Sequence, residues 1–274
     1  MMATVDETCI LLANETLELP ENRVPVLPHV QIPGGPTEEI TSFLSSNSYN
    51  NLREKAEAHL IVDYFEDVQV DFSRKTREDV VSWLVDTGLS LSLGSHTIAM
   101  AVSCFDRFLA VRRIGKESVA EVAAACLWIS TKLYDGVPPL SYLSSVTGSK
   151  DENIVSMEEV ILRELQWQVS SVPVEEFVPF MRSRMSRLGF EVDGKILEML
   201  LDVSLLSFDV VRRSACIVAA ACVLLGSEIQ YPEMNSSMRS KTFAEVLDLD
   251  HSELIEVKEI LHASFQTFIM ASRQ

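Results

Sequence analysis

The stretch AAACLWISTK at residues 123–132 decides the fold, because it recurs as AAACVLLGSE at residues 219–228, at a constant offset of 96. Small side chains at helical spacing let neighbouring helices approach closely, so each copy is predicted to be the central helix of a bundle. Each copy precedes a short segment and then a long helix with a charged face, at residues 152–167 and 252–269. The repeat predicts two tandem five-helix units joined near residues 170–173. Coincidence between two buried alanine-rich helices is the competing explanation.

Hydrophobic periodicity predicts an all-α chain, since no segment shows a convincing alternating strand pattern. The predicted helices of the first unit are Leu52–Asp67, Thr76–Thr87, Ser95–Val111, Ser118–Tyr134, Leu140–Val146 and Asp151–Trp167. We expect the oxygen of Ser95 to cap its helix, and Gly136 with Pro138-Pro139 to end the helix before them. The fold class is therefore two tandem five-helix folds with an N-terminal helix.

Residues 1–45 differ in composition from the rest of the chain. They hold half of the ten prolines, and seven acidic residues against the single Arg23. Such a segment cannot propagate a helix and buries little, so we expect a flexible acidic lead-in. The predicted organisation is this lead-in over 1–45, a first unit with the N-terminal helix over 46–170, and a second, divergent unit over 171–274.

Composition excludes several classes of function. The formal charge of −17 argues against nucleic-acid binding, which needs clustered Lys and Arg. Five cysteines without a CxxC pair indicate buried thiols of a reduced intracellular protein, not a disulfide framework. The acidic N-terminus has no signal-peptide pattern, and the apolar run at residues 217–225 is too short to span a membrane. We expect a protein of the nucleus, the cytoplasm or both.

Motifs of catalysis are missing from the sequence. We find no glycine-rich phosphate loop, no HExxH or CxxC metal motif, and no nucleophile elbow. The five histidines have no metal-ligand spacing, and paired acids such as Glu158-Glu159 are typical of solvated helix faces. The sequence therefore predicts no enzyme activity, no cofactor and no small-molecule substrate.

Three segments, in order and spacing, carry a resemblance to a known family. They are IAMAVSCFDRFL at residues 98–109, ISTKLYD at residues 129–135 and SMEEVIL at residues 156–162, preceded by Arg77 and by WLV at residues 83–85. Together they resemble the cyclin box, over about residues 50 to 170. The internal repeat then implies a second cyclin fold, and the family implies two tandem cyclin-like folds.

The resemblance implies a regulatory subunit that binds a cyclin-dependent protein kinase as a heterodimer and stabilises the active conformation of that kinase. It places Lys132 and Glu158 at the family positions that hydrogen-bond kinase main chain, with Leu133, Leu162 and Trp167 as the apolar contacts around them. Two alternatives stay open: Lys132 also suits the negative end of its own helix, and Trp167 also suits an ordinary core.

The resemblance assigns other residues to structure or to a degenerate site. Arg77 and Asp106 match the internal ion pair of the family, which fastens the first helix of the box to the second. The family's substrate-docking patch corresponds to Thr76, Asp79, Val80 and Trp83, where polar Thr76 and charged Asp79 replace apolar residues. We therefore expect weak or absent docking of Arg-x-Leu peptides.

Three classes of function are distinguished by these features. The first is the kinase activator, acting in cell-cycle or related control. The second is a cyclin-fold scaffold that binds a partner without activating a kinase, as the altered patch and acidic surface suggest. The third, an all-helical enzyme, would need acid-rich metal sites of the Asp-Asp-x-x-Asp kind, which the sequence lacks. The subclass of cyclin, the kinase and its substrates stay open.

Overall fold

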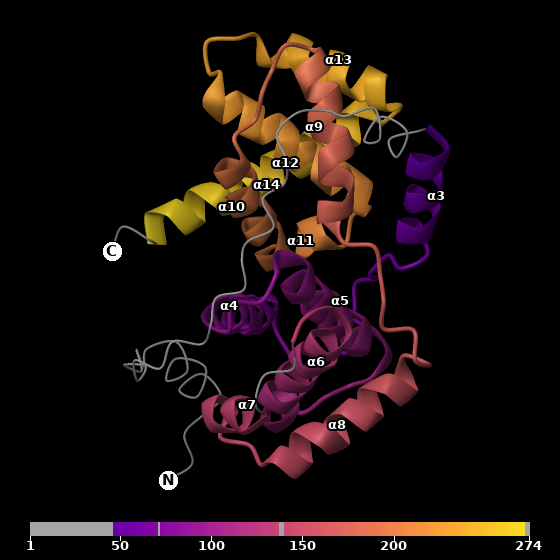
Figure 1. Cartoon of the computed structure of the whole chain (residues 1–274), viewed down its shortest axis with the longest axis vertical. Helices are drawn as coiled ribbons and strands as arrows, with labels where there is room; N and C mark the ends of the chain where they lie inside the picture. The colour runs from indigo at the N-terminus through magenta and orange to yellow at the C-terminus, as the bar shows by residue number, and fades with distance from the viewer. Residues whose placement is uncertain (1–45, 71, 137–139, 272–274) are drawn as a thin grey trace.

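The computed structural model describes residues 46–70, 72–136 and 140–271, and within these ranges all regular structure is helical (Figure 1). The predicted lead-in and Pro138-Pro139 lie outside the described residues. The helices of the N-terminal half are α3 (Ser46–Glu57), α4 (Arg74–Ser90), α5 (Ser95–Val111), η1 (Lys116–Ser118), α6 (Val119–Tyr134), α7 (Leu140–Thr147) and α8 (Asp151–Glu164). Those of the C-terminal half are η2 (Val174–Phe177), α9 (Val178–Arg187), α10 (Gly194–Leu206), α11 (Phe208–Val211), α12 (Ala215–Gln230), α13 (Ser236–Leu247) and α14 (His251–Ala271).

The two alanine-rich copies form α6 and α12, each of 16 residues and related by the offset of 96. Helix α6 contacts α4, α5, α7 and α8, while α12 contacts α9, α10, α13 and α14. Both helices are buried along most of their length because alanine and cysteine leave room for close neighbours. Each is therefore the central helix of its half.

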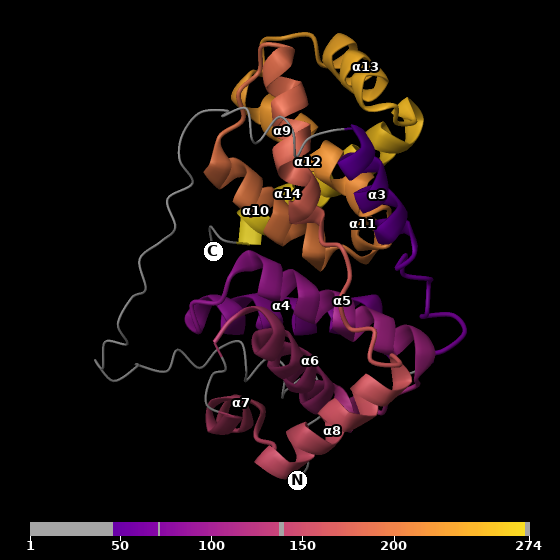
Figure 2. The ribbon, with the colours of Figure 1, turned by 45° about the vertical axis from the view of Figure 1, so that its right-hand side comes forward.

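Buried side chains form two hydrophobic clusters, one around α6 and one around α12. Helices α6 and α12 lie in the lower and upper parts of the molecule in Figure 2. Helix α3 belongs to the N-terminal half of the chain, yet its buried Tyr49 and Ala56 belong to the cluster around α12. Conversely, Leu205 and Phe208 from the C-terminal half belong to the first cluster. The halves thus exchange packing elements, and a division of the chain at residue 170 stays a prediction.

The first predicted helix ends earlier than expected, at Glu57 instead of Asp67. Tyr49 stacks on Phe180 in the C-terminal half, with ring centroids 4.1 Å apart. Tyr64, by contrast, donates a hydrogen bond to the Asp106 carboxylate in the N-terminal half, at 2.8 Å. A straight helix could not reach both halves, so the chain leaves the helix between these residues.

The predicted cap at Ser95 is wrong. The N-cap of α5 is Gly94, which makes no side-chain cap bond. A distant carboxylate replaces it: Asp135, after α6, accepts from the Gly94 backbone N–H at 2.9 Å and from the Thr97 hydroxyl at 2.6 Å. Free first-turn N–H groups need an acceptor, but sequence neighbours are not the only source of one.

Candidate functional site

The candidate site is an ion pair between the last turn of α6 and the middle of α8. The Lys132 Nζ lies 2.7 Å from both carboxylate oxygens of Glu158. It also lies 4.8 Å from the centroid of the Trp128 ring, a cation–π contact on its own helix. The structure thus brings together two residues that the resemblance assigned to one function. The Lys132 ammonium faces Glu158, and no bond to the last carbonyls of α6 is found among the described residues.

Both members of the pair keep hydrogen-bonding capacity toward a second molecule. The side chains are 36% exposed for Lys132 and 15% exposed for Glu158. A lysine ammonium has three donors and a carboxylate has about four acceptor positions, so one donor and several acceptors stay free. The Lys132 ammonium can donate to a carbonyl oxygen of a second molecule, and the Glu158 carboxylate can accept from an N–H group, without loss of the ion pair.

Apolar side chains surround this pair on the outside of the molecule. Leu133 and Trp167 are 50% and 74% exposed, and Leu162 is half-buried. Two further exposed residues, which the sequence analysis does not single out, are Tyr134, at the end of α6, and Val155, one helical turn before Glu158. Their positions, two residues after Lys132 and three before Glu158, are the signal in the sequence that could have identified them. Large exposed apolar side chains rimming a polar centre are typical of a protein-binding surface.

The backbone that presents Trp167 at the surface has a left-handed conformation. Gln166 and Trp167 have φ values of +52° and +62°, which bulky residues rarely adopt. The Trp167 N–H donates to the Leu162 carbonyl at 2.8 Å and closes the end of α8, which is at Glu164 and not at Trp167. Arg107 of α5 donates to the Gln168 carbonyl and fixes the following residue. The high exposure rules out the ordinary-core explanation of Trp167, and strained backbone of this kind clusters at functional sites.

Arg77 on α4 and Asp106 on α5 form a fully buried ion pair. The Arg77 Nε and Nη2 each lie 2.7 Å from one carboxylate oxygen of Asp106, and both side chains are 0% exposed. Burial alone would lower the Arg77 pKa, but the adjacent Asp106 carboxylate raises it overall. The Tyr64 pKa is raised by burial and by the same carboxylate.

The same arginine reaches across to the C-terminal half. Its Nη1 donates to the carbonyls of Leu205 and Leu206, at 3.1 and 2.8 Å, near the end of α10. Its guanidinium carbon also lies 5.4 Å from the Phe208 ring centroid. Arg77 therefore fastens α4 to α5 and the N-terminal half to the C-terminal half. This second attachment could not be predicted from the sequence, because every residue has a backbone carbonyl that can accept a hydrogen bond.

The residues of the degenerate patch lie on α4. Val80 is buried in the first cluster, and Trp83 is half-buried and packs against it. Thr76 is half-buried and takes part in the cap of the helix with Ser73, while Asp79 pairs with Lys75 at 2.9 Å. Of the four residues, two are thus polar and engaged with their own helix, which leaves a smaller apolar area than an unbroken patch would have.

Residues 46–70, 72–136 and 140–271 contain no group of three or more His, Cys, Asp or Glu side chains that could hold a metal ion. The four cysteines in these ranges are free and buried. None of the described helices is both long enough and apolar enough to cross a membrane.

Comparison with known proteins agrees with this architecture. Residues 47–170 match the family model of the cyclin N-terminal domain. Cyclin-A3-2 of Arabidopsis thaliana is 29% identical over 198 residues, which are 68% of this chain and 53% of that protein. Cyclin-A3-1 of Oryza sativa subsp. japonica is 29% identical over 232 residues, 82% of this chain and 60% of that protein. The chain therefore spans less than two thirds of the length of these curated relatives.

Solved structures share the fold at low sequence identity. A viral cyclin from herpesvirus saimiri superposes with a TM-score of 0.66 at 16% identity, covering 79% of this chain and 96% of the viral one. A chain of the yeast RNA Pol II CTD kinase CTDK-1 complex superposes with a TM-score of 0.53 at 17% identity, covering 77% and 70%. The helical architecture is thus that of cyclin structures, and the chain belongs to the cyclin family.

Proposed function

We propose that this chain is the regulatory subunit of a cyclin-dependent protein kinase and has no catalytic activity of its own. The observation that carries the proposal is the Lys132–Glu158 pair, exposed at the junction of α6 and α8 and rimmed by exposed apolar side chains. Family membership supports it, as does the fold shared with a chain of a kinase complex. We propose a nuclear or cytoplasmic location, in cell-cycle or related control.

The mechanism follows from what a kinase lacks before activation. A kinase aligns its ATP phosphates only when a glutamate on a mobile helix pairs with a strand lysine. A rigid partner that binds only the aligned arrangement shifts the population toward it, and a shift from 1:99 to 99:1 needs about 5.5 kcal/mol of differential binding. Lys132 and Glu158 would hold main-chain groups of the kinase, while Leu133, Leu162 and Trp167 supply the apolar contact.

The rigidity of the surface comes from the elements behind it. Asp135 ties the end of α6 to the start of α5, and Tyr134 bonds Ser170 at 2.9 Å. We propose that the units of 46–170 and 171–274 act as one platform, with the surface on the first. The segment of 1–45 is proposed as a lead-in outside this platform.

The test is co-purification of the full chain with a cyclin-dependent kinase, followed by a phosphorylation assay. Lys132→Ala and Glu158→Ala are compared with Arg163→Ala and Glu159→Ala, which remove an ion pair of 2.5 Å on the same helix α8. We expect the first two variants to lose both binding and activation, and the control variants to keep them. Binding without activation would instead support the scaffold function, and equal behaviour of all four variants would contradict the proposed surface.

We also propose that the α4 patch does not select substrates with Arg-x-Leu segments. Asp79 and Thr76 support this, because a charged and a polar side chain stand where an apolar slot would be needed. A titration of the chain with such a peptide should show no saturable binding. Tight, saturable binding would refute this part of the proposal.

A further inference from the structure

Helix α9 carries positive charge that the described part of the chain does not neutralise. Arg182, Arg184 and Arg187 lie within six residues, in a chain with 40 acidic and 23 basic side chains. Arg182 donates to the Val192 carbonyl at 3.0 Å, whereas Arg184 and Arg187 form no ion pair with another described residue. The negative end of α9 favours a cation in its last turn, but that accounts for one such side chain more readily than for three.

A second positive feature lies against the same helix. The first turn of α3 contains no acidic residue, and the macrodipole of a helix N-terminus favours an anion. Tyr49 in this turn stacks on Phe180 of α9, and the Arg184 guanidinium carbon lies 4.7 Å from the same Phe180 ring. We call Arg184, Arg187 and the first turn of α3 the α9 basic face. Figures 1 and 2 both show α3 beside α9.

The chain that leads into α3 has the complementary charge. Residues 1–45 contain seven acidic side chains and one arginine, and Glu38 and Glu39 lie seven or eight residues before Ser46. Eight extended residues span at most about 29 Å, so the covalent connection keeps these carboxylates within reach of the basic face. Tethering over so short a length gives an effective concentration on the order of millimolar.

We propose that acidic residues of segment 1–45, with Glu38 and Glu39 foremost, bind the α9 basic face of their own chain. The contact is electrostatic, so it weakens as salt screens it. Helix α8, which carries Glu158, lies at the opposite end of the molecule from α9 (Figures 1 and 2). The contact therefore places Glu38 and Glu39 away from the Lys132–Glu158 surface.

Zero-length carbodiimide coupling tests the contact in the full chain. Arg184→Lys/Arg187→Lys keeps both charges and supplies amines that couple to a touching carboxylate. At low protein concentration we expect intramolecular links from position 184 or 187 to Glu38 or Glu39, identified by mass spectrometry. The yield should fall by about threefold or more in 0.5 M NaCl, where the Debye length is only a few ångströms.

Two control variants show whether the new links depend on the proposed contact. Arg163→Lys on α8 should link to Glu159 and not to segment 1–45, while Glu38→Gln/Glu39→Gln should remove the new links. Trypsin adds a second readout, because Arg23 is the single Lys or Arg of the segment. Arg184→Gln/Arg187→Gln should accelerate cleavage after Arg23 by about threefold, since release from a tethered site restores access. The proposal would be overturned if positions 184 and 187 linked only to acidic residues outside segment 1–45 or to other molecules. It would also be overturned if Arg184→Gln/Arg187→Gln left the rate of cleavage after Arg23 unchanged.

Discussion

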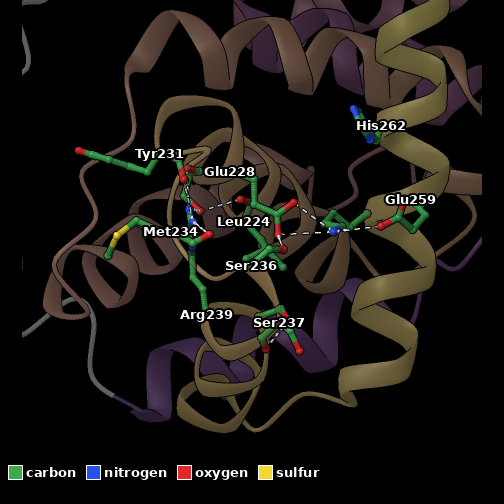
Figure 3. Close-up of polar contacts among 12 residues, drawn as sticks. Leu224, Glu228, Tyr231, Met234, Ser236, Ser237, Arg239, Glu259 and His262 are labelled. Atoms are coloured by element: carbon green, nitrogen blue, oxygen red, sulfur yellow. Dashed lines mark hydrogen bonds and ion pairs between the residues drawn. The ribbon is translucent and has the colours of Figure 1, made fainter.

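The two halves carry the same kind of ion pair, between the central helix and its long neighbour, with the charges reversed. Lys132 on α6 pairs with Glu158 on α8, whereas Glu228 on α12, at the offset of 96, pairs with Lys258 on α14 at 3.1 Å. The cation of the first pair is 36% exposed, and the cation of the second is 9% exposed. Figure 3 shows Glu228 and its neighbours joined by a network of polar contacts. Both halves of the repeat thus contain such a pair, and the two pairs differ in the accessibility of the lysine side chain.

Neighbouring side chains explain why the second pair is closed. Ser236 of α13 bonds the Glu228 carboxylate, and Lys258 also lies 3.0 Å from Glu259. Beside them, buried Arg239 donates to the carbonyls of Ser227 and Tyr231, at 2.6 and 3.0 Å (Figure 3). The contacts of Ser236 with Glu228 and of Glu259 with Lys258 use hydrogen-bonding capacity that stays free in the first pair. The second pair therefore serves the packing of its own half.

The first half has no counterpart of Arg239. The residue 96 positions earlier is Leu143 on α7, which is buried and apolar. Arg239 donates to carbonyls at the end of α12, whereas no arginine in the described part of the chain is found to donate to the last carbonyls of α6. The comparison shows that an ion pair between a central helix and its long neighbour is available to a partner only where its own chain leaves it uncovered.

The largest effect is expected at the pair that both halves enclose. Asp106→Ala leaves the Arg77 guanidinium buried without its carboxylate, which should cost about 3–5 kcal/mol of the free energy of unfolding. Urea denaturation of this variant and of Glu159→Ala, an exposed control, measures the difference. Equal stability of the two variants would show that burial does not separate these classes of ion pair.

A smaller effect should separate the Lys132–Glu158 pair from the Lys258–Glu228 pair. Lys258→Met removes an ammonium that is 9% exposed and that pairs with both Glu228 and Glu259. We expect a loss of about 1–3 kcal/mol in stability, because the hydrogen bonds of a buried charged group contribute more than those of an exposed one. Lys132→Met should lose less than about 1 kcal/mol, because a partly exposed pair contributes little. Thermal unfolding of both variants compares them directly. A larger loss for Lys132→Met would reverse the comparison.

The pH dependence of stability tests the interior of the second half. Burial raises the pKa of Glu175 in η2 from the ordinary 4.5 to about 7, with smaller contributions from the nearby carboxylates of Asp202 and Glu176. The folded state therefore binds a proton that the unfolded state has released. This contribution is complete below pH 4.5 and is lost as the pH rises through about 7.

Glu175→Gln is neutral at every pH and should remove that loss. Relative to the variant, the unmodified chain should lose on the order of 1–3 kcal/mol between pH 5 and pH 8. Thermal unfolding across this range measures it, with Glu176→Gln as the neighbouring control. Parallel curves for the unmodified chain and Glu175→Gln would mean that Glu175 is ionised without cost.

The smallest effect on stability is expected from exchanging the charges of the first pair. Lys132→Glu/Glu158→Lys gives it the polarity of Glu228 and Lys258, and stability should change by less than about 0.5 kcal/mol, since an exposed pair has little to lose. Kinase binding should nevertheless fall, because donor and acceptor have changed places. A stable variant that still binds would show that polarity at this surface is irrelevant.

The sequence was sufficient for the features that depend on local pattern. Alanine at helical spacing predicted α6 and α12, and ordered motifs identified the residues of the Lys132–Glu158 and Arg77–Asp106 pairs before any distance was known. Short-range patterns could not predict which half a helix packs against. The packing of α3 on α9 and the bond from Asp135 to Gly94 join residues far apart in sequence, and neither has a motif.

Accessibility was the other property that the sequence did not determine. Trp167 suited either a core or a surface by composition, and only the left-handed backbone at Gln166 and Trp167 places it outside. Likewise, the second pair is closed in part by Ser236, which bonds Glu228 and lies eight residues beyond it in another helix. Exposure is decided by neighbours in space, so it needed coordinates.

The most direct measurement is the dissociation constant of the full chain for a cyclin-dependent kinase, determined by calorimetry for Glu158→Ala and Glu159→Ala in parallel. These adjacent glutamates share helix α8 and differ in whether they face Lys132. We predict a rise of about 30-fold or more for Glu158→Ala, since truncating one member of a desolvated charge pair costs 2–5 kcal/mol, and a change within about twofold for Glu159→Ala. Equal affinities for both variants and the unmodified chain would contradict the proposed surface.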